Sequence, residues 1–376
     1  MGRRVVVVGA GIVGTCVGLR LAQQGAEVTL IESEALGAGT SGTSFAWLDA
    51  SHPSLTPYVG LNIAGLDAWR RLGDGIGSPS WLALTGTLTW ETGTDAAAEL
   101  SQHAHGLRER GHPAVELSRR QVSELEPDVI VDPGVDSVLM YPSEGYLWPR
   151  PAIADLVAHG RRSGLRVRTE CPVASFDGDG RRVTGVRLAS GEHLRADVVV
   201  TCLGRWTPQL LETVDVELPF TAPEPAPSAA VGLLVVTTPT AARLRRVVFA
   251  NGLMMRPDGA GRLLLHGDEQ DTRVRVDTAT VPAPDVAREL VQLARARLRG
   301  ADLARVESAT IGVRALPRDR MPIVGPVLDG LYVVATHSGM TLAPALGELV
   351  AGEILDERQF DALEPFRPAR FERAVA

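Results

Sequence analysis

The chain of 376 residues contains no lysine, so all 38 of its basic residues are arginines. A pyridoxal-phosphate Schiff base, a lysine-dependent aldolase and a phosphate-binding P-loop each require a lysine amine. The composition therefore excludes these three kinds of site. We attribute the absence to a GC-rich genome that favours arginine codons.

Cysteine and long apolar runs are also scarce. Cys16, Cys171 and Cys202 are odd in number and far apart, which argues against disulfides. No apolar run is long enough to span a bilayer, and no secretory leader precedes the first strand pattern. We expect a cytoplasmic protein without a membrane span, and we predict no metal site.

The remaining composition is that of a globular protein, with 45% hydrophobic and 22% charged residues. The length favours about two domains. A net charge of -7 argues against a nucleic-acid partner, because such partners are bound by clustered positive charge. A small molecule is the expected partner, and association of the chain into a homo-oligomer is compatible with the sequence.

The N-terminus has the pattern of a strand, a helix and a second strand. The β-branched run from Arg4 to Gly9 predicts a strand buried on both faces, and 12–24 predicts a helix that ends before Gly25. The turn GAGIVG and the acidic residue that closes the second strand predict a dinucleotide site, with pyrophosphate at the helix N-terminus and ribose on the carboxylate. NAD and FAD both fit this motif alone. The expected contacts are Gly9, Gly11, Ile12, Val13, Gly14, Glu32 and Ser33.

Further segments carry a resemblance that covers nearly the whole chain. They are GTSGTSFAW, PVASF, ADVVVTCLGRWTPQLL, GVRALPRDRMPIVG and THSGMTLAPALGELVAGEIL. In order and spacing they resemble the D-amino-acid oxidase superfamily, in particular its glycine oxidase and sarcosine oxidase branch. The resemblance implies an α/β fold, in which a Rossmann-like FAD-binding domain (1–84, 150–216 and 310–376) is interleaved with an α+β substrate domain on an antiparallel sheet (85–149 and 217–309).

The resemblance also implies contacts to FAD. A helix that begins near Thr341, which can cap it, would direct its positive end at the reduced flavin. The alternatives are a solvated turn for the Ser/Thr/Gly loop, a core tryptophan for Trp206 and a surface or core histidine for His337. Non-covalent attachment is expected, because the last cysteine lies far upstream of the flavin loop. The implied contacts are Thr40, Ser41, Phe45, Ala46, Trp47, Val173, Gly204, Trp206, His337, Ser338, Gly339, Met340, Thr341 and Leu342.

For the substrate, Arg314 corresponds to the family arginine that binds a carboxylate, and its fork suits a bidentate contact. Ala315 stands where the family has proline, and Arg318 and Arg320 are rival arginines. The stretch LMMR at 253–256 departs from the tyrosine-containing strand of glycine oxidases. We expect Trp47, Leu253, Met254 and Met255 to form a more apolar pocket, although core packing is the commoner use of such side chains.

The resemblance implies an FAD-dependent oxidase of glycine or of an N-substituted glycine. Hydride would pass from Cα to flavin N5, and the products would be glyoxylate, an amine and, with O2 as acceptor, hydrogen peroxide. No catalytic base is assigned. One alternative is a D-amino-acid or secondary-amine dehydrogenase that uses a quinone or carrier, since the lysine that activates oxygen in sarcosine oxidase relatives is missing. Another is an FAD-binding subunit without turnover.

Overall fold

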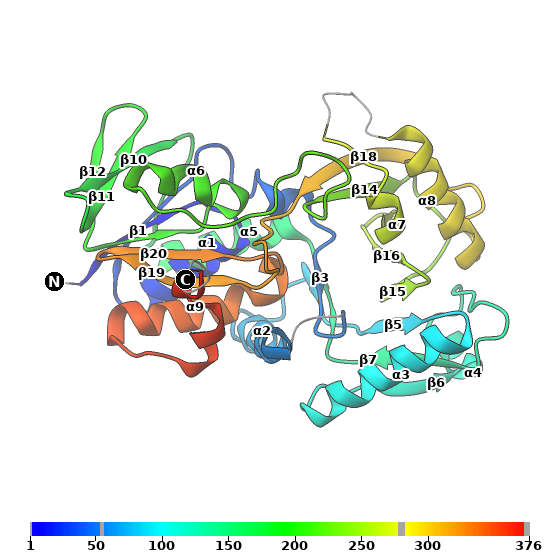
Figure 1. The fold of residues 1–376 in the computed structure, drawn as a ribbon. Helices are drawn as coiled ribbons and strands as arrows, with labels where there is room; N and C mark the ends of the chain where they lie inside the picture. Colours follow the sequence, from blue (N-terminus) through cyan, green and yellow to red (C-terminus); the bar gives the residue numbers. More distant parts are fainter. Residues whose placement is uncertain (1, 53–55, 277–282, 372–376) are drawn as a thin grey trace.

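A computed structural model describes residues 2–52, 56–276 and 283–371 (Figure 1). The N-terminal part lies in a six-stranded sheet with the order β19-β20-β13-β1-β2-β9, in which only the edge strand β19 is antiparallel to its neighbour. Four of the five residues of β1 are buried, as its β-branched run predicts. The strands are β1 (Arg4–Val8), β2 (Glu27–Ile31), β9 (Arg166–Arg168), β13 (Val198–Thr201), β19 (Ile323–Leu328) and β20 (Leu331–Ala335).

Helices cover one face of this sheet, and a small sheet covers the other. Helix α1 packs against α9 and α5, and α2 packs against α9. The predicted first helix therefore exists and ends one residue early. The elements on the two faces are α1 (Ile12–Gln23), α2 (Thr56–Gly75), α5 (Pro149–Arg162) and α9 (Gly339–Asp356), and opposite them β10 (Val173–Gly178), β11 (Val183–Leu188), β12 (His193–Arg195) and α6 (Thr207–Leu211).

A second large sheet of eight strands lies to the right in Figure 1, with the order β18-β14-β17-β16-β15-β5-β7-β6. All its pairs are antiparallel except β15 with β5. Helix α8 packs on β14, β16, β17 and β18. The strands are β5 (Thr87–Trp90), β6 (Val115–Ser118), β7 (Ser137–Tyr141), β14 (Val231–Thr237), β15 (Val247–Ala250), β16 (Leu253–Pro257), β17 (Leu263–Gly267) and β18 (Val306–Val313), with helices α3 (Thr94–Glu109), α4 (Arg119–Leu125), α7 (Asp268–Asp271) and α8 (Pro284–Arg297).

A three-stranded sheet connects these two layers. It consists of β3 (Trp47–Leu48), β8 (Gly145–Leu147) and β4 (Leu82–Ala83). Phe45, Trp47 and Tyr146 at this sheet form one apolar cluster with Met254 of β16 and Leu264 of β17. The loop after β2 is therefore anchored to the eight-stranded sheet. The exact division into two domains stays a prediction.

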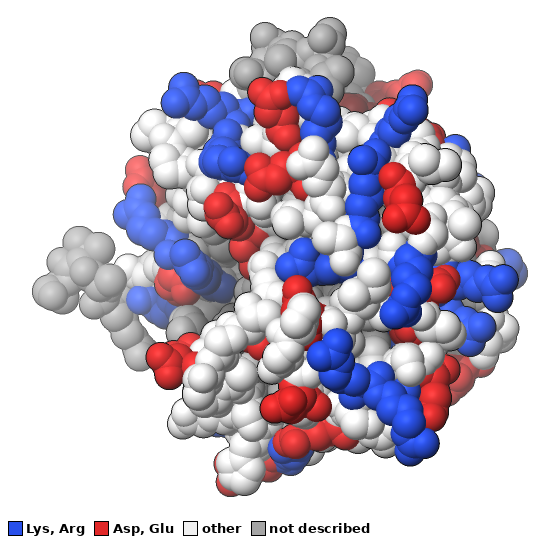
Figure 2. Space-filling model, turned by 90° about the vertical axis from the view of Figure 1, so that its right-hand side faces the viewer, with Lys and Arg blue, Asp and Glu red and all other residues white. Residues whose placement is uncertain are grey.

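The cysteines, the hydropathy of the helices and the surface charges also bear on the predictions. The three cysteines are free. No helix within the described residues is long and apolar enough to cross a membrane. On the face that Figure 2 shows, arginine and carboxylate side chains are interspersed. Because neighbouring charges of opposite sign largely cancel at a distance, the field of this face is short-ranged.

Candidate flavin and substrate site

The turn between β1 and α1 is closely packed at its glycines. Gly9 has a φ of +102°, and a Cβ placed on Gly14 would lie 1.9 Å from the Gly9 carbonyl oxygen. A Cβ on Gly11 would lie 2.9 Å from the Ser41 Oγ. No side chain caps α1 at Gly11. Apart from the Ile12 amide, which donates to the Ser41 Oγ at 3.0 Å, the amides of this helix N-terminus can be met by an anion that approaches the backbone, as a pyrophosphate does.

Glu32 lies at the carboxyl end of β2, beside this turn. Its Oε2 accepts the Ala10 amide at 2.8 Å, and its Oε1 accepts the Ser33 hydroxyl at 3.0 Å. The Cys171 amide donates to the Glu32 carbonyl at 2.9 Å, so the segment that enters β10 at Val173 passes close by. These contacts hold the carboxylate where a ribose next to the pyrophosphate would meet it.

The loop after Glu32 forms the short 3₁₀ helix η1 (Thr40–Thr43) and bonds to two distant segments. The Thr40 hydroxyl donates to the Val313 carbonyl of β18 at 2.6 Å, and the Ser41 Oγ accepts the Ile12 amide at 3.0 Å. Phe45, Ala46 and Trp47 are buried. The solvated-turn alternative is therefore wrong, because the loop connects the start of α1 to the eight-stranded sheet.

The turn after β13 meets the same loop. Gly204 begins the 3₁₀ helix η2 (Gly204–Trp206) with a φ of +57°. Trp206 is 41% exposed, so it is not a core tryptophan. The Arg205 guanidinium lies 3.8 Å from the centre of the Trp206 ring and donates to the Thr40 hydroxyl at 3.2 Å. A Cβ on Gly39 would lie 2.8 Å from the Trp206 ring. Three segments that are far apart in sequence thus converge here.

The N-terminus of α9 lies beside that of α1, since a Cβ on Gly339 would be 3.1 Å from the Val13 side chain. The helix begins at Gly339 with Ser338 in the capping position and no capping side chain. The prediction that Thr341 caps the helix is wrong, because Thr341 lies inside it and its Oγ1 accepts the Asp49 amide at 3.2 Å. The side chains of Met340 and Leu342 are in the core, so only their backbone could meet a cofactor.

His337, the residue just before α9, is exposed at the surface of this site. Desolvation by the surrounding protein, and then the charge of Arg314, lower the pKa of its imidazole. His337 is therefore neutral at pH 7. The bond from the Thr40 hydroxyl to the carbonyl of Val313, the residue before Arg314, links the predicted substrate arginine to the predicted flavin loop.

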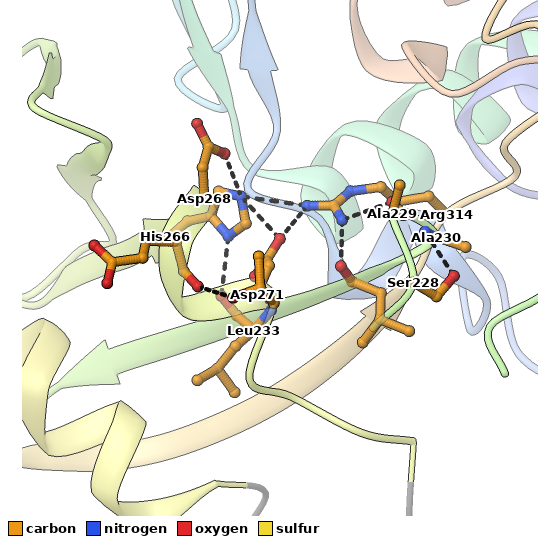
Figure 3. Close-up of polar contacts among 11 residues, drawn as sticks. Ser228, Ala229, Ala230, Leu233, His266, Asp268, Asp271 and Arg314 are labelled. Atoms are coloured by element: carbon orange, nitrogen blue, oxygen red, sulfur yellow. Dashed lines mark hydrogen bonds and ion pairs between the residues drawn. The ribbon is translucent and has the colours of Figure 1, made fainter. Parts of the chain in front are cut away.

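Arg314 follows β18 and is bonded on several sides. Its Nη2 donates to the Asp271 carboxylate at 2.7 Å and lies 3.3 Å from the His266 Nε2. Its Nη1 donates to the carbonyls of Ala229 and Val231. The rival residues Arg318 and Arg320 are exposed on the following turn. Of the three arginines, only Arg314 reaches into the protein among strands of the eight-stranded sheet (Figure 3).

Leu253 and Met255, which we predicted to line the substrate pocket, point away from Trp47. Leu253 and Met255 are buried in the core beneath α8, whereas Met254 packs with Phe45 and Trp47. Successive strand residues point to opposite faces, so Leu253 and Met255 cannot line a pocket that Trp47 also lines. Met254 is the residue of this strand that lies on the Trp47 side.

The comparisons with known proteins agree with this geometry. The model of the FAD dependent oxidoreductase family matches residues 4–353. The chain belongs to this family. It is thus an FAD-dependent oxidoreductase, which confirms the predicted cofactor, and the residues of the glycine turn, Glu32 and the two open helix N-termini fit FAD.

This flavoprotein is similar over its whole length to curated relatives. It is 27% identical over 391 residues to a glycine oxidase of Pseudomonas aeruginosa, covering 98% of this chain and 99% of the relative. It is also 27% identical over 442 residues to a D-amino acid dehydrogenase of a Methylobacterium species, covering 99% and 100%. The solved structure of glycine oxidase from Geobacillus kaustophilus matches with a TM-score of 0.80 at 23% identity, covering 98% and 99%. The predicted superfamily and fold class are therefore confirmed.

Sequence analysis missed several polar residues of the flavoprotein's site. Arg256 is 2% exposed, and its Nε donates to the Phe45 carbonyl at 2.6 Å while its guanidinium lies over the rings of Phe45 and Tyr146. Arg256 thereby fixes the cofactor loop on β16. An arginine in an otherwise apolar strand was the available signal. The sequence around Asp271 and His266, which bond to Arg314, contains no comparable exception to the local pattern.

A pair of buried carboxyl groups lies beneath the flavin loop. Glu144 is fully buried and accepts the amides of Ala50 and Ser51 at 2.9 and 2.8 Å. Burial, and then the charge of Glu144, raise the pKa of Asp49 to about 8. The folded protein therefore favours protonated Asp49, and the stability that this proton contributes is lost as pH rises toward 8.

We expect Asp49→Asn to remove this pH dependence, because asparagine resembles the protonated acid. Relative to the variant, the wild-type free energy of unfolding should fall by about 1–3 kcal/mol between pH 5 and pH 9. Urea denaturation of both proteins, each saturated with FAD, at both pH values measures this difference. A difference that stays constant with pH would show that Asp49 ionises normally in the folded protein.

Proposed function

We propose that the protein oxidises glycine or an N-substituted glycine at its Cα–N bond. The observation that supports this most is that the backbone next to Arg314, the predicted carboxylate anchor, bonds to the flavin loop: the Val313 carbonyl accepts the Thr40 hydroxyl at 2.6 Å. A substrate whose carboxylate bonds to Arg314 would therefore have its Cα near the flavin loop. Holding the reacting carbon at the acceptor is a large part of catalysis in such enzymes.

Arg314, the N-terminus of α9 and His337 each have a separate role in the proposed reaction. FAD, when bound, supplies the acceptor for the hydride from Cα. Arg314 binds the carboxylate, and the N-terminus of α9 stabilises negative charge that develops nearby. Neutral His337 adds no positive charge that would repel the amine. Overall, the substrate, O2 and water would give an amine, glyoxylate and hydrogen peroxide.

A dehydrogenase is the second candidate. It is favoured by the similarity to a D-amino acid dehydrogenase and by the absence of lysine, which oxygen activation in sarcosine oxidase relatives requires. In that case electrons would pass to a quinone or a carrier protein, and the amine chemistry would be unchanged.

Anaerobic titration of the holoenzyme tests the proposal. We expect glycine, sarcosine or a longer N-alkyl glycine to bleach the flavin absorbance, with glyoxylate as product. Admission of oxygen should then restore the colour and release one peroxide per flavin from an oxidase, whereas a dehydrogenase should need a quinone analogue. A flavoprotein that none of these compounds bleaches would overturn the substrate class.

A further inference from the structure

Both Nη atoms of the Arg314 guanidinium already contact protein acceptors (Figure 3). Nη1 bonds to two carbonyls, of Ala229 and Val231. Nη2 bonds to Asp271 at 2.7 Å and lies 3.3 Å from the His266 Nε2. The His266 Nδ1 donates to the Leu233 carbonyl at 3.1 Å, so its Nε2 accepts from Arg314 when the ring carries a single proton. Three of the four Nη hydrogens thus donate to a carbonyl or a carboxylate oxygen, and the fourth faces the His266 Nε2.

Asp271 is itself held firmly in this contact. Its other oxygen, Oδ1, accepts the buried Leu233 amide at 2.8 Å. The side chains of Arg314 and Asp271 are only 23% and 11% exposed, so water screens their attraction weakly. A Cβ on Gly232 would lie 2.6 Å from the Arg314 Nη2, which shows how closely the guanidinium lies on β14. The Arg314–Asp271 ion pair is therefore held in a fixed position by its surroundings.

An incoming carboxylate would meet an arginine whose charge is already neutralised. It would either replace Asp271 or lie next to it, and two carboxylates that share a site repel one another. A small carboxylate such as glycine has few other contacts with which to offset this repulsion. The carboxylate alone is thus a poor source of affinity here.

The binding energy that is missing can come from an apolar surface next to the ion pair. The Phe45 ring lies 6.2 Å from the His266 ring, between centroids, and Phe45 packs with Trp47 and Met254. The Phe249 ring continues this surface at 5.8 Å from Trp47. We refer to Phe45, Trp47, Phe249 and Met254 as the aromatic wall. Phe45 and Trp47 are each 9% exposed and Phe249 is half-buried, so an apolar substituent that covers this remaining surface contributes affinity that does not depend on Arg314.

We propose that Asp271 acts as an internal competitor for the carboxylate site. The substrate is accordingly an N-substituted glycine with a large apolar substituent, and not glycine. This inference rests on the proposed function and names its substrate class. Asp271 is a specificity-determining residue that acts through Arg314.

The first test uses Asp271→Asn and Asp271→Ser in the FAD-loaded protein. Acetate, which cannot be oxidised, is titrated into the oxidised enzyme while the flavin absorbance is followed. Removal of the competing charge should tighten acetate binding about ten-fold or more. The matched control is Asp268→Asn, which removes the same charge from the same short helix but lies 3.8 Å from His266 and does not contact Arg314. It should change acetate binding by less than about three-fold.

The second test compares substrates. In the wild type, kcat/KM for N-benzylglycine should exceed that for glycine by about 100-fold or more, and Asp271→Asn should reduce this ratio about ten-fold by improving glycine. Acetate binding that weakens or stays unchanged in both Asp271 variants would overturn the inference, and so would a wild type that uses glycine as well as N-benzylglycine. If no glycine derivative is oxidised, the proposed function fails, but the acetate titration still decides the role of Asp271.

Discussion

Replacing Gly14 with alanine is expected to abolish FAD binding. The added methyl group would lie 1.9 Å from the Gly9 carbonyl oxygen, a backbone atom that cannot rotate away. Helix α1 must then move off the turn that holds the pyrophosphate. We expect the protein to lose its flavin absorbance and about 3 kcal/mol or more of unfolding free energy, because backbone contacts of this kind relax poorly.

The flavin-to-protein absorbance ratio and urea denaturation measure both effects, and Gly60→Ala is the matched control. Gly60 is an exposed position in α2, where a Cβ would have no neighbour within 4 Å. Alanine there should retain full FAD and raise stability by about 0.5–1 kcal/mol, as in other exposed helix interiors. Full flavin content in the Gly14 variant would contradict the placement of the pyrophosphate at this turn.

The features that could be predicted from sequence are those that local patterns determine. The β-branched run of β1, the helical spacing of α1 and the glycines between them are contiguous, so their structure depends little on distant residues. The family resemblance located the loop after Glu32 and the start of α9. It could not show that Thr40 bonds to Val313, or that Arg205 bonds to Thr40, since such contacts arise only when separate segments fold together.

The wrong placement of Leu253 and Met255 and the failure to predict Asp271 have separate physical causes. β16 is apolar on both faces, with Leu253 and Met255 on one side and Met254 on the other, so the alternation of its side chains did not reveal which face adjoins Trp47. Asp271 lies in the acidic stretch DEQD, a composition typical of a solvated turn. Its burial against Arg314 depends on strand order within the eight-stranded sheet, which the sequence alone does not specify.

The second large effect is expected from Arg314→Met. N-benzylglycine and N-methylbenzylamine form a matched pair of substrates, because the second lacks only the carboxylate. Although Asp271 limits the affinity that the guanidinium provides, removal of the guanidinium also removes the contact that positions Cα, so kcat/KM for N-benzylglycine should fall by about 10². The value for N-methylbenzylamine should change by less than about three-fold, since it makes no carboxylate contact.

Arg314→Met also leaves Asp271 as a buried carboxylate without its cation, which could lower activity by disturbing the fold. The double variant Arg314→Met with Asp271→Asn removes that charge, and it should recover stability without recovering the preference for the carboxylate. Arg314→Lys should be intermediate, because an ammonium keeps the charge but cannot form the planar fork. Equal losses for both substrates in the double variant would mean that Arg314 serves the structure of the sheet, whereas a loss confined to N-benzylglycine would identify it as the carboxylate anchor. The comparison of two substrates in one protein makes this distinction independent of how much each variant is destabilised.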